Sequence, residues 1–211
     1  MKKLTAEQIQ ENLDKFFGFI KKYLSPERAA KLVKFYESID LNLMTSPASS
    51  KISHHNCFPG GYLDHVNRVV EAALVMDKVW ERFGQKKDYT LEELVFSAIN
   101  HDLGKLGSNN EAMYIPNDSQ WHIEKQGAHY KINNKLTHMR VSDRSLYELQ
   151  KAGIPVSEKE FLAIKLHDSL YEEANKVYLI THNQDTAVKT NLVHVLHQAD
   201  FMASRIENQN Q

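Results

Sequence analysis

The chain has 211 residues, 42% of them hydrophobic and 25% charged, and its formal net charge is −1 at pH 7. This length suits a single domain with its own hydrophobic core, and so small a net charge gives the molecule no overall attraction to nucleic acid or anionic lipid. The single cysteine, Cys57, excludes a disulfide within the chain, and no apolar run is long enough to span a bilayer. We therefore expect a cytoplasmic protein with no membrane partner.

Two helices are expected in the N-terminal part of the chain. A capping box that begins at Thr5 predicts a helix as far as residue 24, and Ser25 followed by Pro26 predicts the start of a second one. Neither helix carries residues with evident chemistry. We interpret residues 1–40 as a helical layer of the same domain as residues 41–211.

The middle of the chain alternates between helices and irregular segments. Ser, Pro and Gly make residues 41–60 a loop, and the apolar periodicity of residues 61–84 predicts a long helix. A capping box at Thr90 starts the next helix, which runs to about residue 101. Residues 106–140 are polar and weakly patterned, with a small hairpin expected around "MYIP" and "HYKIN". A segment of this length without periodicity is typically functional or flexible.

Three more helices are predicted in the C-terminal part, at residues 143–152, 158–167 and 186–207. Ser157 opens the second of them with a capping box. The chain contains only 8 glycines and 5 prolines, which favours helices over a turn-rich β protein. The predicted fold class is therefore an all-α bundle with a long, partly irregular insertion around residues 106–140.

The segment "INHDLGK", residues 99–105, places a histidine and an aspartate side by side where a helix ends. Adjacent residues on an α-helix point about 100° apart, so His101 and Asp102 could not both face one point from the middle of a helix. At a helix end the backbone can turn, and Gly104 permits such a break. Both side chains can then reach the same ion.

Two further candidate ligands lie on other predicted helices. His65 lies at the edge of the apolar stripe of the helix at 61–84. Asp200 falls within the apolar face of the last helix, where an unpaired carboxylate is costly. Helical bundles build metal sites from inward-facing side chains of this kind. We predict that His65, His101, Asp102 and Asp200 bind one divalent ion.

This ordered set resembles the HD-domain superfamily of metal-dependent phosphohydrolases, whose pattern is a histidine, a His-Asp pair and a distant aspartate. "PASSKISHHNCFPGGYLDHVNRV" is similar to the segment that leads into the family's first histidine helix, "NHDLGK" to its doublet and "HQADFMASR" to its last helix. The resemblance spans about residues 46–205 and is to compact HD proteins of bacteria and phages, including the HD domain of certain 3′–5′ exoribonucleases. It implies an HD-domain helical bundle over residues 41–211.

The resemblance also bears on the number of ions. Many HD proteins hold two metals through additional histidines. His167 looks like the later of these, whereas Val141 stands where relatives often carry the earlier one. His138 is the candidate replacement, so both one ion and two are open. Mixed histidine and carboxylate ligands suit Mn, Fe, Ni, Co or Zn.

The reaction that the resemblance implies is hydrolysis of a phosphoester in a nucleotide or short oligonucleotide by metal-activated water. We expect Asp102 to orient that water, Lys105 and His55 to act with it in catalysis, and both of them with His167 to bind the phosphate. No Lys/Arg stripe points to long nucleic acid, which makes that a less favoured partner. A homo-oligomer stays open.

Two other functions fit the same residues. Some HD proteins hold two irons and activate O₂, and a degenerate HD fold would bind a nucleotide without turnover. Trp121, Tyr114 and Tyr130 in the long insertion could stack on a base, with local packing as the alternative. On the last helix, His194 is expected at the surface and His197 beside Asp200, in support of a ligand.

Overall fold

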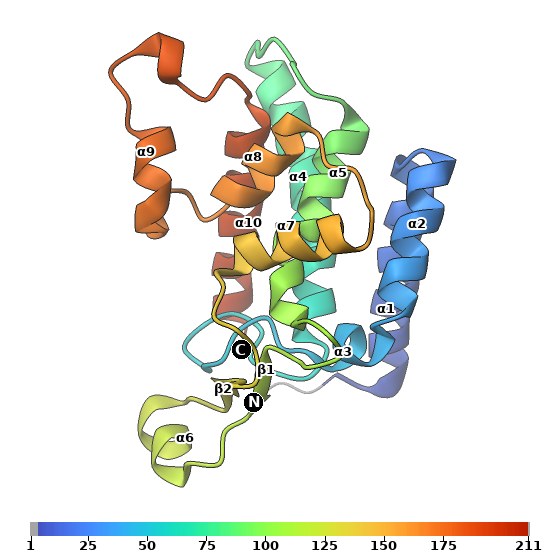
Figure 1. Ribbon diagram of the computed structural model, residues 1–211, viewed down its shortest axis with the longest axis vertical. Helices are drawn as coiled ribbons and strands as arrows, with labels where there is room; N and C mark the ends of the chain where they lie inside the picture. Colours follow the sequence, from blue (N-terminus) through green and yellow to red (C-terminus); the bar gives the residue numbers. More distant parts are fainter. Residues whose placement is uncertain (1–3, 211) are drawn as a thin grey trace.

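The computed structural model describes residues 4–210, and within that range the chain forms ten α-helices and one small antiparallel sheet (Figure 1). The helices are α1 (Ala6–Tyr23), α2 (Pro26–Glu37), α3 (Asp40–Thr45), α4 (Gly61–Arg82), α5 (Leu91–Asn100), α6 (Gln120–Gln126), α7 (Val141–Lys151), α8 (Glu158–Leu166), α9 (Lys176–Leu179) and α10 (Leu192–Gln209). The sheet pairs β1 (Tyr114–Pro116) with β2 (Tyr130–Ile132). The predicted all-α class is confirmed.

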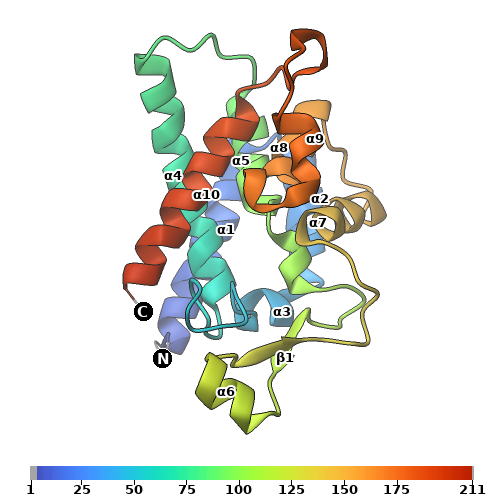
Figure 2. The same ribbon diagram turned by 90° about the vertical axis from the view of Figure 1, so that its left-hand side faces the viewer.

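The centre of the bundle is the pair formed by α4 and α10, which lie side by side (Figure 2). Helix α4 is buried on most of its circumference, because α1, α5 and α10 all pack against it. Helix α8 packs against both α5 and α10 and closes the other side of the core. Helices α5 and α8 therefore pack beside α4 and α10, and the inward side chains of these four helices can converge.

The capping signals predicted the helix starts well. The capping boxes at Thr5, Thr90 and Ser157 are all present. Each provides hydrogen-bond acceptors for two backbone N–H groups at the start of its helix. The predicted hairpin is also present, with Tyr114 opposite Ile132. Ser25 begins α2 as expected, although its hydroxyl donates to Glu92 and makes no capping bond to its own helix.

Three segments differ from the sequence-based expectation. The expected loop 41–60 begins with the short helix α3, and the insertion carries α6, which buries none of its residues. The last helix begins at Leu192 rather than at residue 186. The side chain of Thr190 accepts a hydrogen bond from the Leu192 N–H, and the backbone before it forms only a 3-10 turn. Such local side-chain bonds compete with helix formation.

The remaining part of the predicted loop, residues 46–60, folds across the N-terminal end of α4. Gly60 has a left-handed backbone with φ of +80°, and a Cβ on Gly61 would lie 2.2 Å from the carbonyl oxygen of Asn56. Both glycines are therefore needed for the chain to double back before α4. The loop is also tied to the insertion, because the Ile52 N–H donates to the carbonyl of Gly127.

Helices α1 and α2 share one hydrophobic core with the rest of the bundle. Phe16 of α1 and Tyr36 of α2 are fully buried in it, and the Tyr36 hydroxyl donates to the side chain of Asn100 on α5. The division into a layer at 1–40 and a domain at 41–211 stays a prediction. Within the described range, no helix has the length and apolar character needed to cross a membrane.

Candidate metal centre

The His-Asp doublet lies where α5 gives way to a 3-10 turn, Leu103–Leu106. His101 still has helical backbone angles, whereas Asp102 has φ of −105° and ψ of 8° and has left the helix. The turn is held by α7, where the Ser145 hydroxyl accepts a hydrogen bond from the Gly104 N–H. The same hydroxyl lies 3.1 Å from the His101 carbonyl oxygen. The backbone therefore turns at the doublet, as the sequence predicts.

Gly104 has a different role from the one expected. Its backbone is not in the left-handed region, so conformational freedom is not what the position requires. Instead, a Cβ at residue 104 would lie 2.2 Å from the carbonyl oxygen of Val141. Glycine lets the first turn of α7 approach the doublet closely, and that contact fixes the direction of both site side chains.

All four predicted ligands meet in one place. The His65 Nε2 atom lies 3.4 Å from a carboxylate oxygen of Asp102 and 3.2 Å from one of Asp200. The His101 Nε2 atom lies 3.4 Å and 3.8 Å from the same two oxygens. His167, at the end of α8, adds a third imidazole whose Nε2 lies 3.6 Å from the other oxygen of Asp102.

The three imidazoles all turn the same nitrogen toward the centre. The Nδ1 atoms of His101 and His167 each lie 2.8 Å from a backbone carbonyl, and that of His65 lies 3.0 Å from the carboxylate of Glu207. Carbonyl and carboxylate oxygens can only accept, so each Nδ1 must carry the proton. In the neutral ring, Nε2 then presents a lone pair.

Lone pairs on three nitrogens consequently face the oxygens of two carboxylates. The Nε2 atoms of His65 and His101 are completely buried and make no hydrogen bond with the described residues. Buried polar atoms are almost always satisfied, so an orphaned pair facing carboxylates is unusual. Two of the groups that could hold a metal ion are His65 with His101 and Asp102, and His101 with His167 and Asp200, each with ligand atoms within 4.8 Å. This buried cluster is compatible with an HD-type metal site.

An outer set of residues orients the ligands. Glu207, two turns after Asp200 on α10, accepts from His65, and its other oxygen accepts from the Nε of Arg68 at 3.0 Å. A carboxylate behind a ligand histidine fixes the ring and raises its basicity. His197 donates from Nδ1 to the His167 carbonyl at 2.7 Å, which ties α10 to the end of α8.

The charges of the cluster shift several pKa values. Burial alone would raise the pKa of Asp102, but Lys105 and His101 outweigh it and hold that pKa well below its usual range. Burial opposes charge on His65 and His167 as well, yet the surrounding carboxylates raise the pKa of His65 well above its usual value and that of His167 to about 10. The ion-free cluster thus stabilises positive charge, which protons supply when no metal does.

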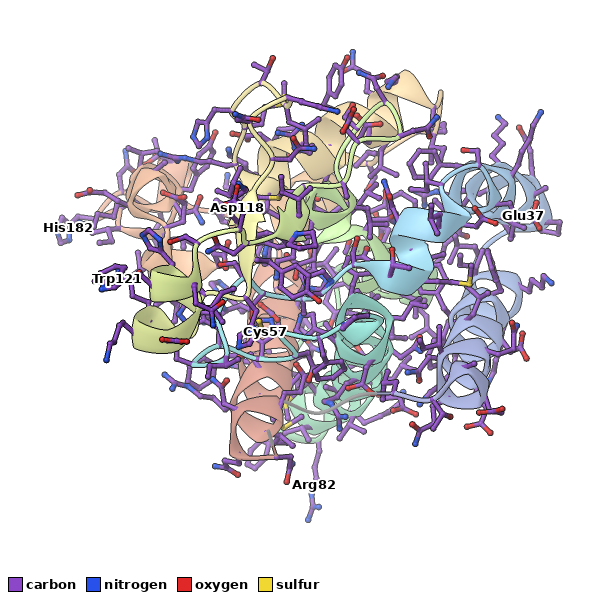
Figure 3. The ribbon with its side chains drawn as sticks, turned by 90° about the horizontal axis from the view of Figure 1, so that it is seen from below. Glu37, Cys57, Arg82, Asp118, Trp121 and His182 are labelled. Carbon is purple, nitrogen blue, oxygen red and sulfur yellow. The ribbon has the colours of Figure 1, made fainter. Side chains whose placement is uncertain are left out.

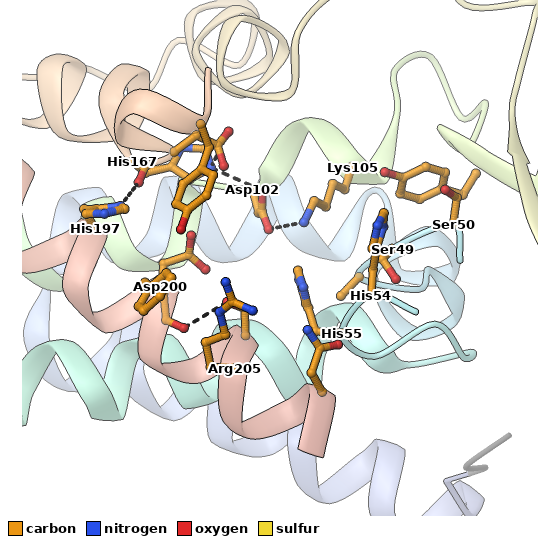
Figure 4. Close-up of a pocket in the computed structure, with 17 residues that line it drawn as sticks. Ser49, Ser50, His54, His55, Asp102, Lys105, His167, His197, Asp200 and Arg205 are labelled. Atoms are coloured by element: carbon orange, nitrogen blue, oxygen red, sulfur yellow. Dashed lines mark hydrogen bonds and ion pairs between the residues drawn. The ribbon is translucent and has the colours of Figure 1, made fainter. Parts of the chain in front are cut away.

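The cluster forms the floor of a cavity of about 530 Å³ (Figure 4). Lys105 and the loop that carries His54 and His55 line one side of it. The Lys105 amine lies 2.5 Å from Asp102. Burial, reinforced by His65 and Lys105, lowers the pKa of His55 to about 2, so this ring is neutral. Cavities of this size suit small-molecule ligands.

Several predicted residues lie elsewhere. His138, the candidate for a second ion, is exposed and belongs to none of the possible metal groups of residues 4–210. His138 lies in the short stretch before α7, which runs along the surface. Trp121 points outward at the periphery (Figure 3), and of the three insertion aromatics only Tyr114 lines the cavity. His194 is exposed, as expected.

Two residues of the site were missed in the sequence. Glu207 lies seven positions after Asp200, which is the same helix face, so the periodicity that places Asp200 inside could have identified it. Arg205 lines the cavity one turn after Phe201, and the same rule applies. Comparison of the chain with protein-family models, with curated proteins and with solved structures finds no match.

Proposed function

We propose that the protein is a metal-dependent phosphohydrolase that cleaves a phosphoester of a nucleotide or short oligonucleotide. The observation that carries the proposal is the set of three imidazole Nε2 atoms facing two carboxylates at the floor of a cavity. The opposed lone pairs need positive charge between them, which a divalent cation would supply. The resemblance of the ordered ligands and their flanks to HD phosphohydrolases supports the same reaction.

His65, His101, Asp102 and Asp200 would hold the ion, with His167 as an additional ligand. A set of nitrogen and carboxylate donors favours Mn, Fe, Co, Ni or Zn over an all-oxygen magnesium site. Such an ion, when bound, supplies Lewis acidity toward a phosphoryl oxygen and toward the attacking water. The side chains that orient a metal ligand are present as well. Glu207 accepts hydrogen bonds from His65 and from Arg68 and so fixes the orientation of the His65 ring.

The protein's own groups would do the rest of the work at the phosphate. Lys105 lies beside Asp102, and its charge is secured because Asp102 outweighs the effect of burial and raises the pKa of the amine. It would bind a phosphate oxygen as a point charge. His55 is neutral, and its Nε2 is buried with no hydrogen-bond partner among residues 4–210. It would orient substrate or water through a hydrogen bond rather than neutralise charge.

The test combines metal content with phosphate release. Purified protein is analysed by inductively coupled plasma mass spectrometry and screened against nucleotides and short oligonucleotides with Mn, Co or Ni. We expect Asp102→Ala to lose both the bound ion and phosphate release while keeping its helical far-UV spectrum. Asp118→Ala, an exposed aspartate paired with Lys131, is the matched control. Full activity in Asp102→Ala would exclude the proposal.

The same samples separate the other two functions. Consumption of O₂ with a visible-region iron spectrum, and no phosphate release, would favour the di-iron reaction. Nucleotide binding without any turnover across the panel would favour a binding module. Each of these outcomes contradicts the hydrolase proposal and leaves the metal site in place.

A further inference from the structure

The cavity above the metal cluster has two unlike sides. One is polar and comes from the loop at 46–60 with Lys105, as described above. The other is aromatic and comes from Tyr171, in the 3-10 turn Ser169–Tyr171 after α8, and from Phe201 on α10. Asp102 and Asp200 also line the cavity (Figure 4).

The part of the aromatic side that Phe201 supplies is built on α10. Asp200 and Phe201 are followed one turn later by Ser204 and Arg205, and all four line the cavity. The backbone that fixes the metal cluster therefore also fixes the aromatic side, so the distance between them cannot vary freely. A ligand that touches both the metal cluster and the aromatic side must have a charged end and a flat end.

The rings of Tyr171 and Phe201 lie nearly parallel to each other. Their ring centroids are 6.2 Å apart, with an angle of 15° between the ring planes. Tyr171 is 73% exposed and Phe201 39%, so two large rings are open to solvent at the edge of a cavity with an ionic floor. Aromatic side chains presented in this way stack on the faces of nucleobases with little dependence on base identity.

Arg205 borders the aromatic side. Its guanidinium carbon lies 5.0 Å from the centroid of the Phe201 ring, and among residues 4–210 the side chain forms no ion pair. The lining contains two cationic side chains and three carboxylates, with the histidines counted as neutral. With a divalent ion bound and the imidazoles neutral, the formal charge of the lining would be +1, which favours an anionic ligand.

We propose that the cavity binds a nucleoside phosphate, with the base against Tyr171 and Phe201 and the phosphate over the metal cluster beside Lys105. This inference rests on the proposed phosphohydrolase function and assigns the residues that would bind the base of its nucleotide substrate. Arg205, at the border of the aromatic surface, is placed to donate a hydrogen bond to the base edge or sugar. A sugar phosphate has no flat apolar face and would leave the aromatic side uncovered.

The experiment measures binding of analogues that cannot be hydrolysed. The four nucleoside 5′-methylenephosphonates and the matching ribose 5-methylenephosphonate, which lacks the base, are titrated calorimetrically into the Mn-loaded protein. We expect the best nucleoside analogue to bind at least about fivefold more tightly than the sugar analogue, the lower end of one stacked base. The ratio should fall toward one in Phe201→Leu and in Tyr171→Leu.

Matched controls are available on the same molecule. Phe83→Leu removes an aromatic ring that is 85% exposed on α4, and Tyr178→Leu removes one on α9, and neither lines the cavity. Both should keep the wild-type ratio. A ratio near one in the wild-type protein, or an unchanged ratio in both cavity variants, would overturn the inference.

The two proposals fail in different ways. If the analogues show the expected ratio but no phosphoester is cleaved with any metal, base recognition stands and the hydrolase proposal falls. If phosphate is released as readily from ribose 5-phosphate as from nucleoside monophosphates, hydrolysis stands and base recognition is overturned. Far-UV spectra and thermal unfolding of Phe201→Leu identify a folding defect, and Tyr171→Leu, at a more exposed residue, then decides the outcome.

Discussion

Three imidazole rings in the cluster keep their protons on Nδ1 because each Nδ1 faces an oxygen that can only accept. When no cation is present, a proton on the inward nitrogen takes its place. Glu207, Asp102 and Asp200 raise the pKa of His65, and Asp168, Asp102 and Asp200 raise that of His167. Protons and a metal ion therefore compete for the same lone pairs. The affinity for metal therefore depends on pH, because each proton on an inward nitrogen must leave before the ion binds there.

This competition predicts proton release. At pH values between the usual histidine pKa of about 6.5 and the pKa of about 10 for His167, His167 is protonated in the ion-free protein. A bound ion must displace that proton. Apparent affinity should therefore rise with pH through this window. Calorimetric titration of Mn²⁺ at pH 7.5 in buffers of different ionisation enthalpy should show at least about one proton released per ion. The exposed-site variant His194→Gln should release as many, and no release would contradict protonation of the inward nitrogens in the ion-free protein.

Glu207 gives a second prediction at the same scale. Glu207→Gln still offers an oxygen to the His65 Nδ1–H but removes the negative charge that makes the ring a stronger donor to metal. We expect metal affinity to fall about 10- to 100-fold, measured by competition with a chelating dye. Glu173→Gln, at a carboxylate that is 86% exposed, serves as the control. Equal affinities in the two variants would exclude a role for Glu207 in supporting the ligand.

At the scale of elements, the sequence predicted the site better where helices carry the residues. Capping boxes and periodicity identified the helices that hold His65, His101 and Asp200. The helix end at the doublet was predicted because adjacent side chains in the middle of a helix cannot both face one ion. Tyr171 could not be found in this way, because the turns after α8 have no periodicity. His138 was misplaced for the same reason, since an irregular segment gives no rule for side-chain direction.

The contact between the 3-10 turn and α7 gives a prediction for a whole element. In Gly104→Ala the new Cβ would overlap the carbonyl oxygen of Val141, so α7 must shift. We expect a loss of about 1–3 kcal/mol in the free energy of unfolding, together with weaker metal binding, measured by urea denaturation and dye competition.

Gly18→Ala provides the matched control for that substitution. Gly18 lies inside α1 with nothing within 4 Å of a new Cβ, so alanine there should stabilise the protein by about 0.5–1 kcal/mol through helix propensity. Unchanged stability and unchanged metal affinity in Gly104→Ala would mean that close approach of α7 does not position the doublet.

At the scale of the whole molecule, a partly buried ion pair between Arg28 and Glu160 joins the N-terminal layer to the site-bearing helices. Both terminal nitrogens of Arg28, on α2, lie 2.6 Å from the carboxylate of Glu160 on α8, and the guanidinium carbon lies 3.5 Å from the ring centroid of Phe96. The Glu160 side chain is only 1% exposed. Removing Arg28 would leave a buried carboxylate without its partner.

We expect Arg28→Met to lower the free energy of unfolding by about 3–5 kcal/mol, measured by urea denaturation followed by far-UV circular dichroism and tryptophan fluorescence. The double variant Arg28→Met/Glu160→Gln should recover part of that loss, because glutamine keeps the Ser157 cap without a buried charge. If α1 and α2 belong to one cooperative unit with the core, both probes will report one coincident transition in the wild-type protein and in both variants. A helical transition that precedes the fluorescence change would instead show that the layer unfolds on its own, and that the ion pair stabilises an attachment rather than the domain.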